Sequence, residues 1–452
     1  MKRILFILVA FLLFQTGYGQ NLPVLKVSKD SSYIVYGNNE PFFWLGGTAW
    51  ELLHRLTREE VDEYLSDRAQ KGFTVIQTVI LAELDGLNTP NAYGEKPLID
   101  NDPTKLNEKY LEHVDYVLTK ANELGLYVGL LPTWGDKFNR KWGLGPEIFD
   151  AGNAAVFGAL IAKRFSGHSN LIWILGGDRI PENDKHYAVI RAMASGIREV
   201  DTTHLMSYHP VGAHRATDFI NDSWLDLDMC QTGHSRTSKE YQYILDAREM
   251  RPKRPIINGE SRYENIPDRF WEKESYGWLD DADVRISAYW SIMAGAAGYT
   301  YGCNDIWQMY DITREPTISA RTGWETALQL PGASQMGYMR TFFERFPWQR
   351  MVPDQSLVLS DNVENQSYVL AAIDSAKQFA LVYIPTGNAV KIDMSGIDAK
   401  TVSAFWFNPR NGQMKNIGDF DTKQAHAFSP WSRGRGSDFV LVLVAKGFPV
   451  DF

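Results

Sequence analysis

The sequence predicts an α/β fold, a (β/α)8 TIM barrel followed by a small C-terminal β-sandwich. Between residue 42 and about residue 345, eight short apolar runs alternate with amphipathic helical segments. The runs are almost continuously apolar, as in parallel strands that are buried on both faces. After residue 350 the pattern changes to short alternating runs without a long helical period. A chain of 452 residues accommodates both parts, because one barrel takes ~250 residues or more.

Each expected barrel strand is an apolar run that ends in polar or small residues. The eight runs cover residues 42–50, 73–80, 126–134, 171–178, 204–210, 227–234, 255–261 and 298–305. A doubly wound sheet is the competing arrangement, and it would carry a glycine-rich phosphate loop after its first strand. Gly46-Gly47-Thr48 does not match that fingerprint. The barrel is therefore preferred.

The helices between these runs carry recognisable start and stop signals. Thr57 and Glu60 form a capping box, and Gly72 ends the helix that follows. An apolar stripe beginning at Leu106 predicts the next helix, which stops at Gly125. Further helices are expected over residues 153–165, 184–199, 238–250 and 282–294. The helix between the fifth and sixth strands is the weakest element, because residues 211–224 show little periodicity.

The C-terminal part reads as a β-domain. Strands are expected over residues 356–360, 367–373, 379–384, 402–408 and 439–445. Residues 408–412 read Asn-Pro-Arg-Asn-Gly, which predicts a hairpin turn. We therefore place the barrel, with an N-terminal β segment, in residues 20–348 and the β-sandwich in residues 349–452.

The first residues have the pattern of a secretory signal peptide. Lys2 and Arg3 precede an apolar run over residues 4–14, and small residues at 17 and 19 form a cleavage site before Gln20. Residues 1–19 are therefore expected to be removed on secretion. No later run reaches the ~18 apolar residues of a membrane span, so no integral membrane segment is expected after cleavage.

Composition narrows the class of protein. The net charge of -9 argues against nucleic acid as a partner. The 14 Trp, 21 Tyr and 23 Phe residues suit the flat, half-polar faces of sugars, although a large core also uses them. The two cysteines, Cys230 and Cys303, form no disulfide framework. They fall on strands that are not neighbours, so two buried thiols are expected.

Two carboxylates stand out at the carboxyl ends of the strands, where the active site of a TIM barrel lies. Asp178 follows the fourth strand and Glu260 ends the seventh, so the two face each other across the barrel mouth. Cleavage of a glycosidic bond needs two carboxyl groups that flank it, and a separation of ~5 Å permits a covalent glycosyl-enzyme. Such closeness would raise the pKa of one carboxyl by like-charge repulsion. The alternative for either residue alone is a salt bridge or a helix cap.

Other strand-end residues are candidates for contact with a sugar. Tyr208, His209 and His234 would bind substrate hydroxyls or orient Glu260. Histidines also suggest a metal site, but no His-x-His pair occurs in the first strand, so neither a metal nor a cofactor is expected. No G-x-S-x-G elbow ends a strand, which argues against a serine hydrolase. The full set of substrate-binding candidates is Trp50, His54, Gln77, Trp134, Arg179, Tyr208, His209, His234, Asp305 and Trp307.

Four sequence blocks resemble the apiosidase-like glycoside hydrolases, family 140. They are FFWLGGTAWELLHRLTREEVDEYL, LIWILGGDRIPEND, PIINGESRYE and FWFNPRNG. The last block resembles the small β-domain that follows the barrel in this family and has been described as collagen-binding. The resemblance implies a retaining enzyme with Asp178 as acid/base and Glu260 as nucleophile. It also implies action on apiosyl linkages of the pectic glycan rhamnogalacturonan-II, in the periplasm or at the cell surface of a Gram-negative bacterium.

One feature departs from the wider clan of retaining barrels. Most members have Asn-Glu after the fourth strand, where this chain has Gly177-Asp178. The shorter acid and the missing amide favour a sugar of unusual shape, such as a branched furanose, and leave other plant glycans open. Two further readings are a non-catalytic carbohydrate-binding barrel and an adhesion protein that works through its β-domain. More simply, the β-domain would pack on the barrel.

Overall fold

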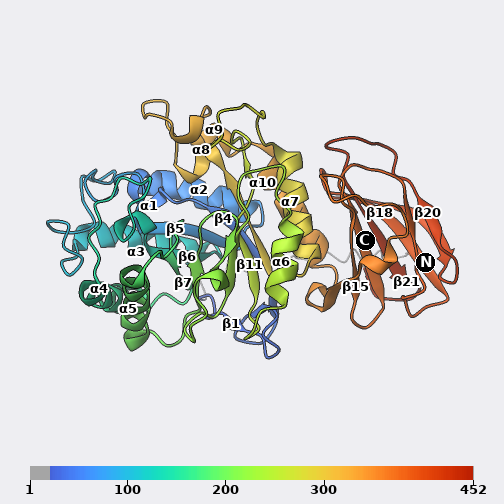
Figure 1. The fold of residues 1–452 in the computed structure, drawn as a ribbon, viewed down its shortest axis with the longest axis horizontal. Coiled ribbons are helices and arrows are strands. Elements are labelled where there is room, and N and C mark those ends of the chain that lie inside the picture. The colour runs from blue at the N-terminus through green and yellow to red at the C-terminus, as the bar shows by residue number, and fades with distance from the viewer. Residues whose placement is uncertain (1–20, 451–452) are drawn as a thin grey trace, which may run out of the picture.

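The computed structural model describes residues 21–450 and contains the expected barrel (Figure 1). Its parallel strands follow the order β8-β7-β6-β5-β4-β13-β11-β10. The backbone N–H of Asp226 and the hydroxyl of Ser207 bridge the gap between β8 and β10, donating to Met206 O (2.9 Å) and Leu227 O (3.0 Å). The strands are β4 (Trp44–Thr48), β5 (Val75–Leu81), β6 (Tyr127–Thr133), β7 (Leu171–Gly176), β8 (Met206–His209), β10 (Asp228–Gln231), β11 (Ile256–Glu260) and β13 (Gly298–Cys303). The short β12 (Tyr263–Glu264) pairs with β13.

The helices lie where the sequence predicts them, with one exception. The capping box is confirmed, since Thr57 N donates to Glu60 Oε2 (2.7 Å) and Glu60 N to Thr57 Oγ1 (3.3 Å). The main helices are α2 (Arg58–Gln70), α3 (Glu108–Glu123), α4 (Ala151–Phe165), α5 (Asp184–Val200), α6 (Glu240–Arg248), α7 (Asp281–Met293) and α10 (Pro331–Phe343). Short helices α1 (Leu52–Arg55), α8 (Asn304–Trp307) and α9 (Trp324–Ala327) complete the set. The helix expected between the fifth and sixth strands is wrong, because that aperiodic segment forms only β9 (His214–Arg215) and a 3-10 turn, Ala216–Asp218.

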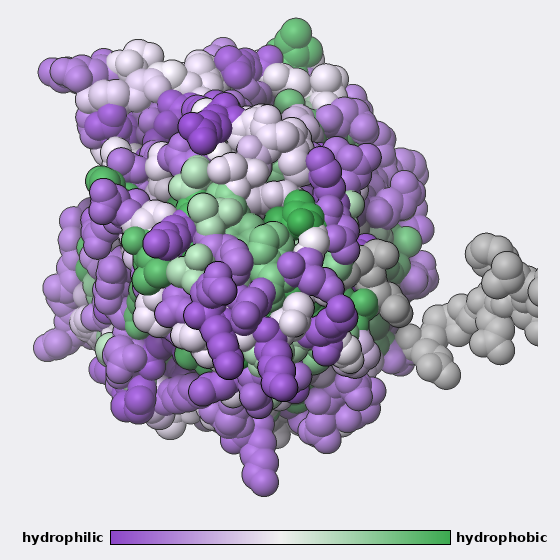
Figure 2. Space-filling view, turned by 90° about the vertical axis from the view of Figure 1, so that its right-hand side faces the viewer, coloured by the Kyte–Doolittle hydropathy of each residue, from purple (hydrophilic) through white to green (hydrophobic). Residues whose placement is uncertain are grey.

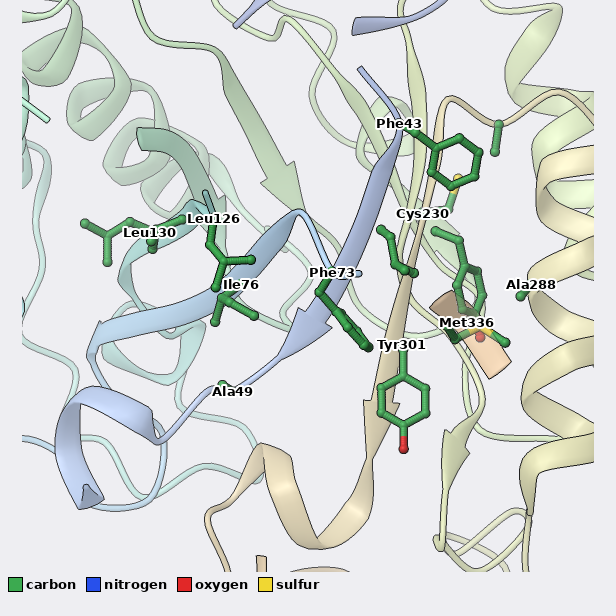
Figure 3. Close-up of a cluster of buried hydrophobic side chains, with 14 of the residues drawn as sticks. Phe43, Ala49, Phe73, Ile76, Leu126, Leu130, Cys230, Ala288, Tyr301 and Met336 are labelled. Atoms are coloured by element: carbon green, nitrogen blue, oxygen red, sulfur yellow. The ribbon is translucent and has the colours of Figure 1, made fainter. Parts of the chain in front are cut away.

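Side chains along each barrel strand point alternately outward and inward, and this produces two hydrophobic cores. Outward side chains such as Ile76 and Leu130 join a cluster that reaches Ala288 on α7 and Met336 on α10 (Figure 3). Inward side chains fill the barrel, where Val75 belongs to a second cluster. The N-terminal sheet of β1 (Lys26–Val27), β2 (Ile34–Val35) and β3 (Pro41–Phe42) contributes buried residues to that second cluster. The barrel interior is therefore filled by side chains. This leaves the carboxyl-terminal ends of the strands as the place for an active site.

The C-terminal domain has two antiparallel layers, which confirms the predicted fold class. One is the six-stranded sheet β14 (Met351–Pro353), β15 (Leu370–Asp374), β16 (Phe379–Ile384), β21 (Phe439–Ala445), β18 (Thr401–Asn408) and β19 (Gln413–Asp421). The other pairs β17 (Val390–Ile392) with β20 (His426–Phe428), and a hydrophobic core lies between them. The predicted hairpin joins β18 to β19. The strand expected over 356–360 is wrong, since the chain forms a 3-10 turn, Gln355–Leu357, there.

The outer face of the large sheet packs against the barrel. Phe407 stacks on Phe342 of α10 at 4.2 Å between ring centroids, and Tyr383 stacks on Tyr289 of α7 at 4.8 Å. Arg285 of α7 also forms a buried ion pair with Asp438 at 2.9 Å. The far end of this domain is mostly hydrophilic, with apolar residues near its centre (Figure 2). The sequence expectation that this domain packs on the barrel is confirmed.

The remaining expectations concern cysteines, membranes and the leader. Cys230 and Cys303 are both buried free thiols, as expected. Within residues 21–450, no helix has the length and apolar character needed to cross a membrane. The predicted signal peptide, residues 1–19, lies outside the described residues.

Candidate active site

A cavity of about 1510 Å³ opens at the carboxyl ends of the barrel strands. Both carboxylates singled out by the sequence line it, Asp178 from the end of β7 and Glu260 from the end of β11. The Asp178 side chain is 21% exposed and the Glu260 side chain 7%. The two predicted acids therefore lie on the wall of one cavity.

The Gly-Gly-Asp block is a turn with three consecutive residues of positive φ. Gly176, Gly177 and Asp178 have φ angles of +94°, +104° and +58°, all in the left-handed region. The turn is anchored because Gly177 N donates to His209 O (3.1 Å) and Gly177 O accepts from Gly135 N (3.0 Å). The strained backbone at Asp178 is held by strands on both sides, which is common at functional sites.

Replacing Gly177 by Ala should displace Asp178. A methyl group there would lie 2.7 Å from Gly135 N, at a φ of +104° that L-residues rarely adopt. We expect Gly177→Ala to lower kcat/KM by about a hundredfold, as a shift of ~1 Å at a reacting group can do. Measured alongside it, Gly167→Ala should keep full activity, because nothing lies within 4 Å of a methyl group at Gly167. Equal activity in both variants would contradict the role of the turn.

Glu260 is held in its ionised form by two histidines. His209 Nε2 lies 2.9 Å from Glu260 Oε2, and His234 Nε2 lies 3.2 Å from Glu260 Oε1. Burial opposes the charge, but these two rings outweigh it and lower the pKa of Glu260 to about 2. His209 comes from the end of β8, and His234 from the loop after β10. Two roles were expected for these histidines, binding of substrate hydroxyls and orientation of Glu260. The structure places His209 and His234 against Glu260, where they can perform the second role.

The pKa of Asp178 is shifted in the opposite direction to that of Glu260. Burial, reinforced by the charges of Glu260 and Glu83, raises the pKa of Asp178 to about 8 despite the neighbouring Arg179. Burial likewise raises the pKa of Glu83, which lines the same cavity, to about 7. Arg179 Nη1 lies 3.4 Å from Asp178 Oδ2, and its Nη2 lies 3.6 Å from Glu83 Oε1. At neutral pH the cavity therefore holds a protonated Asp178 beside an ionised Glu260.

The three expected tryptophans all line the cavity. Trp50 and Trp134 lie 5.1 Å apart between ring centroids, and each also contacts the ring of His209. Trp307 lines another part of the wall. The indole N–H of Trp134 is buried and has no hydrogen-bond partner among the described residues.

Four of the other predicted substrate contacts, His54, Gln77, Tyr208 and Asp305, are not among the residues that line the cavity and are bonded within the protein. Both ring nitrogens of His54 are occupied, by Glu51 (2.7 Å) and the carbonyl of Thr89 (3.0 Å). Gln77 crosses the barrel interior and donates to Gly259 O (3.0 Å). The Tyr208 hydroxyl donates to Arg179 O (2.8 Å). The Asp305 carboxylate accepts from the side chain of Asn265 and the backbone N–H groups of Arg321 and Thr322.

These buried residues support the site from behind. The Glu51 carboxylate that binds His54 also accepts from Leu84 N (3.0 Å), next to Glu83. Gln77 holds the carbonyl just before Glu260. Arg179 is also buried and outside the cavity lining, with its guanidinium 4.2 Å from the ring of Trp142. A buried polar residue at a strand end can either contact the substrate or hold another residue of the site by a hydrogen bond. The sequence alone does not distinguish these two roles.

Several cavity residues were not predicted, and most of them lie on long loops. Trp142 follows β6, while Phe270 and Trp271 follow β11. Trp142 and Trp271 are 62% and 57% exposed, unusual values for tryptophan. The signal that could have revealed them is loop length, because long loops at the carboxyl end of a barrel are usually functional. Tyr263, whose hydroxyl accepts from Trp50 Nε1 (3.1 Å), was missed although it lies three residues after Glu260.

No metal-binding cluster accompanies these groups in the part of the chain that the structure describes: no three or more His, Cys, Asp or Glu side chains are placed to hold an ion together. What the cavity offers instead is a neutral carboxyl and an ionised carboxylate. Such a pair can protonate a leaving oxygen and attack the carbon to which it was bound. The arrangement suits cleavage of an acetal.

Comparisons with known proteins agree with this chemistry. Residues 28–350 match the family described as "Apiosidase-like, catalytic domain", and residues 352–444 match one described as "Putative collagen-binding domain of a collagenase". A solved structure described as a glycoside hydrolase is 31% identical, with a TM-score of 0.86 over 94% of this chain and 98% of its own. A glycoside hydrolase family 5 protein from Bacteroides vulgatus is also 31% identical, with a TM-score of 0.86 over 93% and 94% of the two chains.

A more distant structure, described as a putative glycoside hydrolase from Bacteroides vulgatus, shares the fold at 14% identity, with a TM-score of 0.67 over 94% of this chain and 83% of its own. The search of curated proteins found no match. The family match covers most of the chain, and two solved relatives cover nearly all of it. The chain therefore belongs to the apiosidase-like family and is a glycoside hydrolase.

Proposed function

We propose that this glycoside hydrolase is a retaining enzyme in which Glu260 is the nucleophile and Asp178 the acid/base. The observation that supports the assignment is the opposite shift of the two pKa values within one cavity, to about 2 and about 8. A nucleophile must be ionised and an acid must be neutral before the first step. The reverse assignment would require each group to react from its minor protonation state.

The reaction then proceeds in two displacements. Glu260 attacks the anomeric carbon while Asp178 gives its proton to the leaving oxygen, and a covalent glycosyl-enzyme forms. Asp178, now ionised, takes a proton from water, which attacks the same carbon and releases Glu260. His209 and His234 hold the carboxylate of Glu260 in one orientation through both steps. The net result is a product with the anomeric configuration of the substrate.

We propose a pectic substrate, with cleavage of apiosyl linkages in rhamnogalacturonan-II. The support is the family to which the catalytic domain belongs and the shape of the site. A cavity of about 1510 Å³ exceeds the ~300–1,000 Å³ of common small-molecule sites, so it suits an oligosaccharide. The exposed rings of Trp142 and Trp271 would stack on further sugars. Secretion to the periplasm or cell surface accords with such a substrate and with residues 1–19.

Incubation with defined pectic oligosaccharides tests the substrate. We expect release of an apiose-containing fragment from side chains of rhamnogalacturonan-II, identified by chromatography and mass spectrometry. The Glu260→Gln variant, which keeps the shape of the side chain, serves as the control and should release nothing. Turnover of a different plant glycan, with apiosyl substrates left intact, would refute the apiosyl assignment and keep the reaction class.

The pH profile of kcat/KM should reflect the two carboxyls. Activity requires ionised Glu260 and protonated Asp178, so it should persist from weakly acidic pH up to a basic limb near about 8 and fall above it. Glu83→Gln removes a negative charge that raises the pKa of Asp178, so the basic limb should move to lower pH. Glu63→Gln, at an exposed position on α2, should leave the limb in place. A basic limb unmoved by Glu83→Gln would contradict this coupling.

A further inference from the structure

A loop of the C-terminal domain reaches the back of the active site. It runs between the 3-10 turn at 355–357 and β15, and it carries Gln366. Gln366 Oε1 accepts from Arg262 Nη1 at 2.8 Å, and Gln366 Nε2 donates to the carbonyl of Arg236. One amide of the β-domain is thus bonded to two segments of the barrel.

The first of these segments carries the proposed nucleophile. Arg262 lies two residues after Glu260 and is fully buried. Its guanidinium is bound by Glu240 at the start of α6, at 2.6 and 2.9 Å, and its Nη2 also donates to Ser238 O at 2.9 Å. Gln366 binds the remaining nitrogen, Nη1. Loss of that acceptor would leave a buried, charged donor without a partner, which is costly and favours rearrangement.

The second segment carries the histidine that binds the nucleophile. Arg236 lies two residues after His234, and its guanidinium binds Asp283 (3.1 Å) and the carbonyls of Tyr276 (3.0 Å) and Trp278. Its backbone carbonyl is the group that accepts from Gln366. The position of His234 therefore depends on a loop that is fastened to the β-domain.

We propose that Gln366 is a positioning residue for the Glu260–His234 pair, so that the C-terminal domain is part of the catalytic apparatus. The inference rests on the proposed function, because it assigns the nucleophile to Glu260. The pair meets at 3.2 Å, with Glu260 at the end of β11 and His234 in the loop after β10. Gln366 joins the two chain segments behind them, through Arg262 on one side and Arg236 on the other. A small shift of either segment would change the contact on which nucleophile orientation depends.

The loop is itself held firmly against the barrel. Tyr368 O accepts from Trp290 Nε1 at 3.0 Å, and the Tyr368 ring stacks on Tyr241 of α6 at 4.5 Å between centroids. The Arg285–Asp438 ion pair fastens the same domain to α7. In Figure 1, α6 and α7 lie on the side of the barrel that faces this domain. Gln366 is thus presented from a docked surface rather than from a free loop.

Three variants of the full chain test the inference. Gln366→Met keeps the length of the side chain and removes both hydrogen bonds, and Gln366→Glu keeps the acceptor for Arg262. Gln378→Met is the matched control, because among the described residues Gln378 Nε2 binds only Ala376 O, which belongs to the β-domain. Three quantities are measured for each: kcat and KM separately, the thermal unfolding temperature, and the ¹H–¹³C spectrum of labelled histidine rings without substrate.

We expect Gln366→Met to lower kcat about tenfold and to change KM by less than about twofold, since it disturbs orientation rather than binding. Its His234 ring signals should shift, while Gln378→Met matches the wild type in kcat and in spectrum. Gln366→Glu should recover kcat to within about threefold, because a carboxylate accepts strongly from Arg262. Unchanged kcat and unchanged His234 signals in Gln366→Met would overturn the inference. An inactive wild type would refute the proposed function instead, and the spectra, which need no turnover, would still decide the role of Gln366.

Discussion

Glu260→Ala should abolish turnover, with kcat/KM reduced by roughly 10⁴-fold or more, as expected when a covalent nucleophile is lost. Asp178 cannot take over as nucleophile at neutral pH, because its raised pKa keeps this carboxyl protonated. Azide can occupy the space left by the side chain and attack the anomeric carbon of an activated aryl glycoside. The glycosyl azide formed should have the inverted configuration, since only one displacement takes place.

The control for this variant is Glu272→Ala. Glu272 lines the same cavity, and its only ion pair in the described chain is with Arg269, at 3.5 Å. We expect this variant to retain most of the turnover. If Glu260→Ala stayed near wild-type activity, or if azide gave a product of retained configuration, the nucleophile would be misassigned.

Asp178→Ala should lower activity most on substrates whose leaving group needs a proton in order to depart. On a natural glycoside, whose leaving group is a poor one, we expect kcat to fall by about 10³-fold, within the range of general acid catalysis. On an activated aryl glycoside the first step needs no acid, so it should be much less affected. Hydrolysis of the glycosyl-enzyme would then become slow, because the base that activates water is missing. Steady-state kinetics on both substrates, with a test for a burst of the aryl product, measure the difference.

Azide also distinguishes the acid/base role of Asp178 from the nucleophile role of Glu260. With Asp178→Ala it should speed release of the glycosyl-enzyme and yield a glycosyl azide of retained configuration, because two displacements have occurred. Equal losses on good and poor leaving groups would argue against an acid role for Asp178. The two variants thus predict azide products of opposite configuration from a single substrate.

The scaffold of this site is largely readable from the sequence. Near-continuous apolar strands predict a parallel barrel, and the barrel rule directs attention to the residues that follow each strand. Asp178 and Glu260 were found in this way, and the structure brings both into one cavity. Local signals such as the Thr57 capping box are equally reliable, because they depend on neighbours in the chain.

The sequence is less informative where distant segments decide the role of a residue. His54 follows a strand just as Asp178 does, yet both of its ring nitrogens are taken by Glu51 and Thr89. The aromatic loops that carry Trp142 and Trp271 have no period to reveal them. The polar strand β19 was missed for a related reason, since it lies at the edge of its sheet and is mostly solvent-exposed. Gln366 gave no signal at all, because its importance depends on how one domain docks on another.

The configuration of the first-formed product distinguishes a double displacement from a single one. With methanol present, part of the glycosyl-enzyme should be intercepted, and the resulting methyl glycoside cannot mutarotate. ¹H NMR of the reaction should show a methyl glycoside of the same anomeric configuration as the substrate, as two displacements at Glu260 require. A methyl glycoside of inverted configuration would contradict the double displacement, because it would mean that methanol attacks the substrate directly and that Glu260 forms no bond to the sugar.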